Sequence, residues 1–142
     1  MKTAARTQQA GSPAAHEERG GTETILLIED DDVTRTLTRM ILEDLGYRVL
    51  SAQNGTHAAQ LNRSFDGEIH LLLSDIMIPD GNGVDWARRL REDRPRMSTV
   101  FMSGYSRERL MHEGIPDPGL PFLHKPFPAA VLAWTLREAL DS

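Results

Sequence analysis

The sequence predicts an α/β fold: an open, doubly wound sheet of five parallel strands with helices on both faces. Three observations lead to this prediction. Short apolar segments of strand length alternate along the chain with segments whose apolar residues recur at helical spacing. The first strand candidate, Thr24–Ile28, is continuously apolar, which is typical of strands covered on both faces. The connections are short, so neighbouring elements should pack side by side.

The first half of the chain contains two strand and helix pairs. Thr24–Ile28 is the first strand, and Val49–Ala52 is a second, more polar one. The helix between them ends at Gly46, and Asp31 or Asp32 would cap its start. Asn54 and Gly55 turn the chain into a second, shorter helix. The expected inner stripes are Val33, Leu37, Met40, Ile41 and Leu45 on the first helix, and Ala58, Leu61 and Phe65 on the second.

The second half contains three more pairs. Ile69–Leu73 is a strand that runs into Asp75, and a turn over Pro79–Gly83 leads to a helix with Val84, Ala87 and Leu90 inside. The remaining elements are a strand over Thr99–Met102, a weakly patterned helix around Ser106–His112, a strand over Phe122–His124, and a helix over Ala129–Leu140 with Val131, Leu132, Thr135, Leu136 and Ala139 inside.

The strand order follows from apolarity. The second and fifth strands are the least apolar, and the fifth begins after Pro121, a residue that edge strands tolerate best. This favours the order 2-1-3-4-5, in which ligands bind beyond the carboxyl ends of strands one and three. The side chains expected at the carboxyl ends are Glu29, Asp30, Asp75, Ser103 and Lys125.

Composition limits the classes of protein. A chain of 142 residues suits one domain, which we expect over residues 22–142, with residues 1–21 as a disordered tail or linker because they hold little apolar surface. A net charge of −5 disfavours a nucleic-acid surface. No cysteine is present, and no apolar run approaches the length of a membrane span. We expect a cytoplasmic protein that binds neither nucleic acid nor membrane.

The acids at the strand ends indicate chemistry. Asp75 follows an apolar run, and an unpaired buried charge would cost several kcal/mol or more. Carboxylates gathered in one crevice bind a cation or share protons, and oxygen ligands without Cys or His favour Mg²⁺. Lys125 suits a phosphate oxygen, and Ser103 offers a hydroxyl donor. Asp75, on the central strand, is the best-placed nucleophile.

Four segments carry a family resemblance: Ile25–Asp31, Leu73–Gly83, Phe101–Gly104 and Phe122–Phe127. In this order and spacing they resemble the signature segments of response regulator receiver domains, which have a flavodoxin-like fold. The resemblance implies that Asp75 is the phosphoacceptor. It implies Mg²⁺ held by Glu29, Asp30, Asp75 and the Met77 carbonyl, with Lys125 pairing the phosphate. It also implies a switch made of Ser103 and Phe122.

The resemblance also implies partners. A histidine kinase or histidine phosphotransfer protein would supply the phosphoryl group, and the domain would catalyse only its own phosphorylation and dephosphorylation. The chain ends about one helix after Lys125, so output is expected through a downstream protein or a homodimer on the face of the fourth helix, fifth strand and fifth helix. The segments are most similar to C-terminal receiver domains of hybrid sensor kinases, and both a stand-alone regulator and a kinase fragment stay open.

One alternative from another class is a phosphatase resembling the haloacid dehalogenases. Asp30–Thr34 fits the nucleophile pattern of that family, with Asp30 as the nucleophile. The family also needs an acidic metal-binding motif after the lysine, and only Glu138 and Asp141 remain there, within the final helix. The five arginines between Arg88 and Arg96 are interleaved with acids and indicate a solvated helix face.

Overall fold

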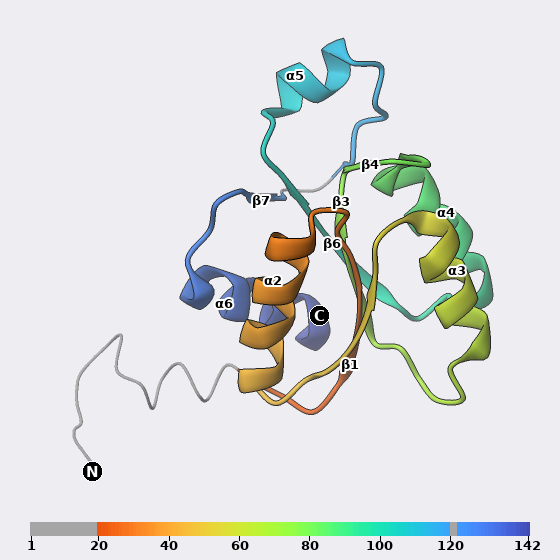
Figure 1. Ribbon diagram of the computed structural model, residues 1–142, viewed down its shortest axis with the longest axis vertical. Helices are drawn as coiled ribbons and strands as arrows, with labels where there is room; N and C mark the ends of the chain where they lie inside the picture. Colours follow the sequence, from red (N-terminus) through yellow and green to blue (C-terminus); the bar gives the residue numbers. More distant parts are fainter. Residues whose placement is uncertain (1–19, 120–121) are drawn as a thin grey trace.

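A five-stranded parallel sheet forms the centre of the computed structural model, which describes residues 20–119 and 122–142 (Figure 1). The order is β2-β1-β3-β6-β7, with all neighbours parallel, so the predicted order 2-1-3-4-5 is confirmed. The expected tail lies almost wholly outside the described residues. The strands are β1 (Thr24–Ile28), β2 (Arg48–Ala52), β3 (Leu71–Asp75), β6 (Ser98–Ser103) and β7 (Leu123–His124).

Helices cover both faces of the sheet, as predicted (Figure 1). Leu26 and Leu72 face a cluster completed by α3 and α4, whereas Ile25 and Leu71 face a cluster completed by α2 and α6. Alternate residues of the central strands are therefore buried on opposite faces, which explains their continuous apolarity. The helices are α2 (Asp32–Asp44), α3 (Gly55–Ser64), α4 (Gly83–Asp93), α5 (Arg107–His112) and α6 (Ala129–Asp141).

The segment after Asp75 contains regular secondary structure that the sequence did not predict. Instead of a simple turn, β4 (Met77–Ile78) and β5 (Gly81–Asn82) pair as a short antiparallel hairpin. The hairpin lies between the end of β3 and the start of α4. It therefore connects the carboxyl end of the central strand to the helix layer.

The predicted buried stripe of α2 is partly wrong. Val33, Leu37 and Met40 are 67%, 55% and 54% exposed, and the buried positions of the helix are Thr38 and Leu42. The sequence pattern missed this rotation because Thr38 is polar, yet it lies buried on the inner side of the helix. On α6, Val131 is likewise exposed rather than inside.

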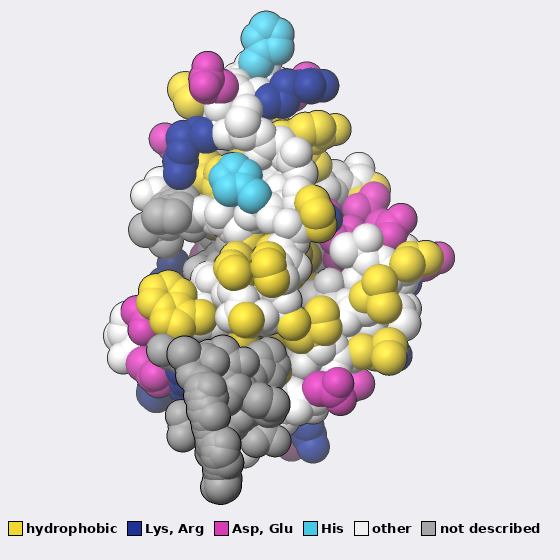
Figure 2. Space-filling model, turned by 90° about the vertical axis from the view of Figure 1, so that its left-hand side faces the viewer, with side chains coloured by type: hydrophobic (Ala, Val, Ile, Leu, Met, Phe, Trp, Pro, Cys, Tyr) yellow, Lys and Arg dark blue, Asp and Glu magenta, His cyan; other side chains and the backbone are white. Residues whose placement is uncertain are grey.

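Exposed apolar side chains gather on one side of the molecule. On the side that carries α2 and α6, Figure 2 shows hydrophobic side chains in a band across the middle of the face. Trp134 of α6 is among the exposed large residues. Within the described residues, none of the helices combines the length and apolarity that crossing a membrane requires.

Candidate functional site

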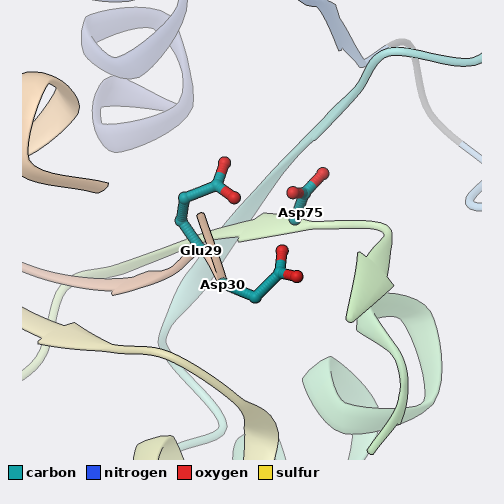
Figure 3. A group of neighbouring side chains, drawn as sticks. All are labelled: Glu29, Asp30 and Asp75. Carbon is teal, nitrogen blue, oxygen red and sulfur yellow. The ribbon is translucent and has the colours of Figure 1, made fainter. Parts of the chain in front are cut away.

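The carboxyl ends of β1 and β3 bring three acids together. Glu29 and Asp30 follow β1, and Asp75 is the last residue of β3, which is the parallel neighbour of β1. One carboxylate oxygen from each residue lies within 4.8 Å of the others. Figure 3 shows the Glu29, Asp30 and Asp75 side chains directed toward a common space beyond the strand ends. Together with Lys125 we call them the strand-end site.

The three acids differ in exposure. Glu29 and Asp75 are buried, whereas Asp30 is exposed. The second Glu29 oxygen, Oε2, accepts a hydrogen bond of 3.0 Å from the amide of Asp31. Asp30 is thus the acid open to solvent, and the other two form the floor of the site.

Lys125 supplies the charge that the buried acids need. Its Nζ donates hydrogen bonds to Glu29 Oε1 at 2.5 Å and to Asp75 Oδ2 at 2.8 Å. Burial alone would lower the Lys125 pKa, but these hydrogen bonds and the charges of the two carboxylates raise it above its ordinary value. Lys125 is therefore a fixed cation.

The charged form of Asp75 is less well stabilised than that of Lys125. Burial raises its pKa to about 7, and the negative charge of Glu29 acts in the same direction, while the hydrogen bond from Lys125 opposes both. A carboxylate whose charged form is disfavoured gains from any further cation placed beside it.

The donor set suits a hard divalent cation. Three carboxylates offer only oxygen, and Mg²⁺ requires oxygen ligands about 2.0–2.1 Å from the ion. Ligands on opposite sides of such an ion lie about 4 Å apart, so oxygens within 4.8 Å of one another need only a small inward movement. Met77, whose carbonyl the resemblance adds to this set, lies two residues after Asp75 in β4.

Ser103 ends β6, the neighbour of β3 on the other side. The residue is buried, and its hydroxyl oxygen accepts a hydrogen bond of 2.9 Å from the amide of Tyr105. Its carbonyl accepts a bond of the same length from the amide of Lys125. This second bond ties the chain that carries Lys125 to the end of β6.

Phe122 lies just before β7 and is half-buried. Its ring centroid is 4.8 Å from that of His124, and the Arg107 guanidinium lies 5.7 Å from the ring. Phe122 also packs against the edge of the cluster that holds α3 and α4. The sequence placed Phe122 in the fifth strand, and β7 begins one residue later.

Gly83 is a residue of this site that the sequence reasoning did not single out. A Cβ at Gly83 would lie 2.3 Å from the carbonyl oxygen of Asp75 and 3.0 Å from Ser74 Oγ. The Gly83 amide also donates a 2.7 Å hydrogen bond to the Ile76 carbonyl. The available signal was a glycine at the start of a helix, where other residues are usually preferred.

A comparison with protein families shows which family the chain belongs to. A family model described as "Response regulator receiver domain" matches residues 25–137, which include all four signature segments. The chain belongs to the response regulator receiver domain family. The recognition made from the sequence is thereby confirmed. The match does not favour the haloacid dehalogenase alternative.

Relatives and solved structures agree with receiver membership. The chain is 33% identical to the sensor kinase CckA of Brucella abortus over 121 residues, 85% of this chain and 13% of the kinase. The crystal structure of the receiver domain from the hybrid histidine kinase CckA has 30% identity and a TM-score of 0.69, and the match covers 82% of this chain and 98% of that one. A response regulator receiver protein from Sinorhizobium medicae has 29% identity and a TM-score of 0.71, with 85% and 96% covered.

The relatives include both hybrid kinases and other regulators. The aerobic respiration control protein ArcA of Escherichia coli is 33% identical over 120 residues, which is 84% of this receiver chain and 49% of ArcA. The chain thus spans half or less of these curated relatives. Receiver domains of this family act in two-component signalling and generally bind Mg²⁺, and the acidic cluster of the strand-end site could hold such an ion.

Proposed function

We propose that the protein is a phosphoacceptor: Asp75 takes a phosphoryl group from a phosphohistidine, with Mg²⁺, and later loses it to water. The observation that carries this proposal is the buried Asp75 carboxylate, bonded to Lys125 and close to Glu29 and Asp30. In this proposal residues 22–142 form the signalling domain, residues 1–21 are a tail or linker, and the protein works in the cytoplasm.

The transfer is a displacement at phosphorus. An Asp75 oxygen forms the new O–P bond while the N–P bond to the donor imidazole breaks. The leaving nitrogen keeps the electron pair of the broken bond and takes up a proton. A bound Mg²⁺, held by Glu29, Asp30, Asp75 and the Met77 carbonyl, would neutralise part of the charge on the phosphoryl oxygens.

The chain's own groups position the phosphoryl oxygens. Lys125 Nζ, 2.8 Å from Asp75 Oδ2, is placed to move its hydrogen bond onto a phosphoryl oxygen. The Ser103 hydroxyl would give up its bond from the Tyr105 amide and turn toward the phosphate. Phe122 would then turn inward as the switch residue. The charge added at Asp75 thus biases a two-state element.

The partner in this proposal is a histidine kinase or a histidine phosphotransfer protein, and the similarity to the sensor kinase CckA supports this class of partner. We propose a relation to the receiver domains of hybrid sensor kinases in particular, because one of the similar solved structures is the receiver domain of the hybrid histidine kinase CckA. Apart from its own phosphorylation and dephosphorylation, the domain catalyses no reaction in this proposal.

Acetyl phosphate with Mg²⁺ tests the assignment directly. The wild-type protein should gain the mass of one phosphoryl group and a slower band on a phosphate-affinity gel, and Asp75→Asn should gain neither. Asp32→Asn is the matched control. It makes the same change at an exposed acid, the first residue of α2, which pairs with Arg35. Phosphorylation that survives in Asp75→Asn and disappears in Asp30→Asn would support the phosphatase alternative instead.

We propose that output runs through the face made of α5, β7 and α6. A hollow of about 440 Å³ lies between β7 and α6 and is lined by apolar groups that include Leu123, Phe127 and Trp134. Size-exclusion chromatography of the phosphorylated protein should show a homodimer, or a complex when the downstream protein is added. Trp134→Ala should weaken whichever of the two forms. An unchanged complex in Trp134→Ala would exclude this face.

A further inference from the structure

The hairpin β4–β5 is fastened to α3 by a carboxylate distant in the sequence. Asp80, at the hairpin's turn, accepts hydrogen bonds from the Gly55 amide at 2.9 Å, the Thr56 amide at 2.9 Å and the Thr56 hydroxyl at 2.7 Å. Asn54, the N-cap of α3, accepts from the His57 amide through its side chain. Asp80 therefore completes the capping of a helix that begins 25 residues before it.

Trp86 closes the same junction from α4. Its Nε1 donates a 2.9 Å hydrogen bond to the Asp80 carbonyl. The indole lies so close to Gly55 that a Cβ there would be 2.1 Å from the ring, and Trp86 itself is 8% exposed. On the outside, the Arg89 guanidinium lies 3.9 Å from the indole centroid. The hairpin turn is thus held between α3 and α4, and we call Asp80, Thr56 and Trp86 the hairpin clamp.

The hairpin leads back to Asp75 over a short, tightly packed path. Met77 pairs with Asn82, the Ile76 carbonyl accepts from the Gly83 amide at 2.7 Å, and Gly83 packs on the Asp75 carbonyl. A shift of the turn would act on Met77 through the hairpin and on the Asp75 carbonyl through Gly83. The clamp therefore fixes one end of the short backbone segment that carries Asp75 and Met77, two of the proposed metal ligands.

We propose that Asp80 and Trp86 are positioning residues for Mg²⁺ binding, which hold the Met77 carbonyl and the Asp75 carboxylate in place relative to Asp30. This inference rests on the proposed function, since it needs a metal at the strand-end site. The physical reason is preorganisation: groups fixed before binding lose less conformational freedom when the ion arrives. The Asp80 carboxylate suits this role: burial would raise its pKa, but hydrogen bonds from Thr56 and Gly55 outweigh that effect and lower it.

The test is the Mg²⁺ dissociation constant of the unphosphorylated protein, measured by isothermal titration calorimetry. Asp80→Asn should bind Mg²⁺ about tenfold more weakly. Asp66→Asn is the matched control, because Asp66 is exposed and its substitution removes the same charge elsewhere. Two variants that leave the net charge unchanged separate geometry from charge. Thr56→Val deletes the hydroxyl hydrogen bond to the Asp80 carboxylate, and Trp86→Phe deletes the hydrogen bond to the Asp80 backbone carbonyl. Each should weaken binding about three- to tenfold.

Thermal unfolding without Mg²⁺ provides the second readout. A purely structural clamp would lower the melting temperature of these variants and leave the dissociation constant of the folded protein unchanged. That result would overturn the inference and leave the phosphoacceptor proposal intact. Weaker binding in Asp80→Asn alone, with normal binding in both neutral variants, would assign the effect to charge and also overturn it. A wild-type protein without Mg²⁺ affinity would refute both proposals.

Discussion

At the scale of single residues, the strand-end site is balanced by one cation. Lys125 bonds to both buried acids, Glu29 and Asp75, which would otherwise repel each other. The raised pKa of Asp75 shows that burial is not fully offset even so. Because burial disfavours the charged form of Asp75, a metal ion beside it would relieve an unfavourable charge.

Position 83 has no room for a side chain larger than that of glycine. Gly83→Ala places a methyl group 2.3 Å from the Asp75 carbonyl oxygen, so the backbone must move. We expect a loss of about 1–3 kcal/mol in the free energy of unfolding by urea, together with weaker phosphorylation by acetyl phosphate. The matched control is Gly104→Ala, since no heavy atom lies within 4 Å of a Cβ there. Equal stability of the two variants would contradict the packing argument.

At the scale of elements, α2 is amphipathic in an unusual sense. The side that packs on the sheet presents Thr38 and Leu42, and an apolar stripe of Val33, Leu37 and Met40 faces outward. This stripe starts three residues after Asp30 in the sequence. Burial inside the domain does not account for these three side chains.

The exposure of α2 can be measured through stability. Leu37→Gln should change the free energy of unfolding by less than about 0.5 kcal/mol, because Leu37 is 55% exposed. Leu42→Ala should cost about 2–5 kcal/mol, because Leu42 is fully buried. Urea denaturation of both variants gives the comparison. A Leu37→Gln cost similar to that of Leu42→Ala would mean that the stripe is packed.

At the scale of the whole molecule, one ion-pair network joins the beginning and the end of the fold. Arg137 of α6 donates to Glu23 Oε2 at 2.7 Å, just before β1, and to the Gly20 carbonyl at 3.1 Å. It also pairs with Asp141. Both Arg137 and Glu23 are largely shielded from solvent. The network therefore joins α6 to the residues just before β1, at the end of the sheet opposite the strand-end site.

This closure predicts a pH dependence of stability. The hydrogen bond from Arg137 lowers the Glu23 pKa below its ordinary 4.5. A lowered pKa in the folded protein means that the stabilisation is complete above about pH 4.5 and is lost as the pH falls through the folded value. Glu23→Gln should cost about 1 kcal/mol at pH 7, and much less near pH 3. Thermal unfolding at both pH values measures this.

The control for the pH experiment is Glu43→Gln, an exposed glutamate on α2. Its melting temperature should stay close to wild type at both pH values. If Glu23→Gln instead lost the same stability at pH 3 as at pH 7, the ionised form of Glu23 would not be the source of the stabilisation.

The fold class, the strand order and the residues at the strand ends could all be predicted from the sequence. Continuous apolar runs such as Thr24–Ile28 are typical of strands buried on both faces, and parallel strands place their carboxyl ends at one edge. Glu29, Asp30, Asp75 and Lys125 therefore had to meet once the order was set. Local pattern was sufficient because these positions depend on where strands end.

The contacts between elements, in contrast, became visible only in three dimensions. The orientation of α2 buries Thr38, a polar residue, and the periodicity of apolar residues cannot register such a position. The hairpin after Asp75 and its clamp depended on Asp80 meeting the first amides of α3 and on Trp86 meeting Gly55. Such contacts join residues far apart in the chain, so no local spacing in the sequence encodes them.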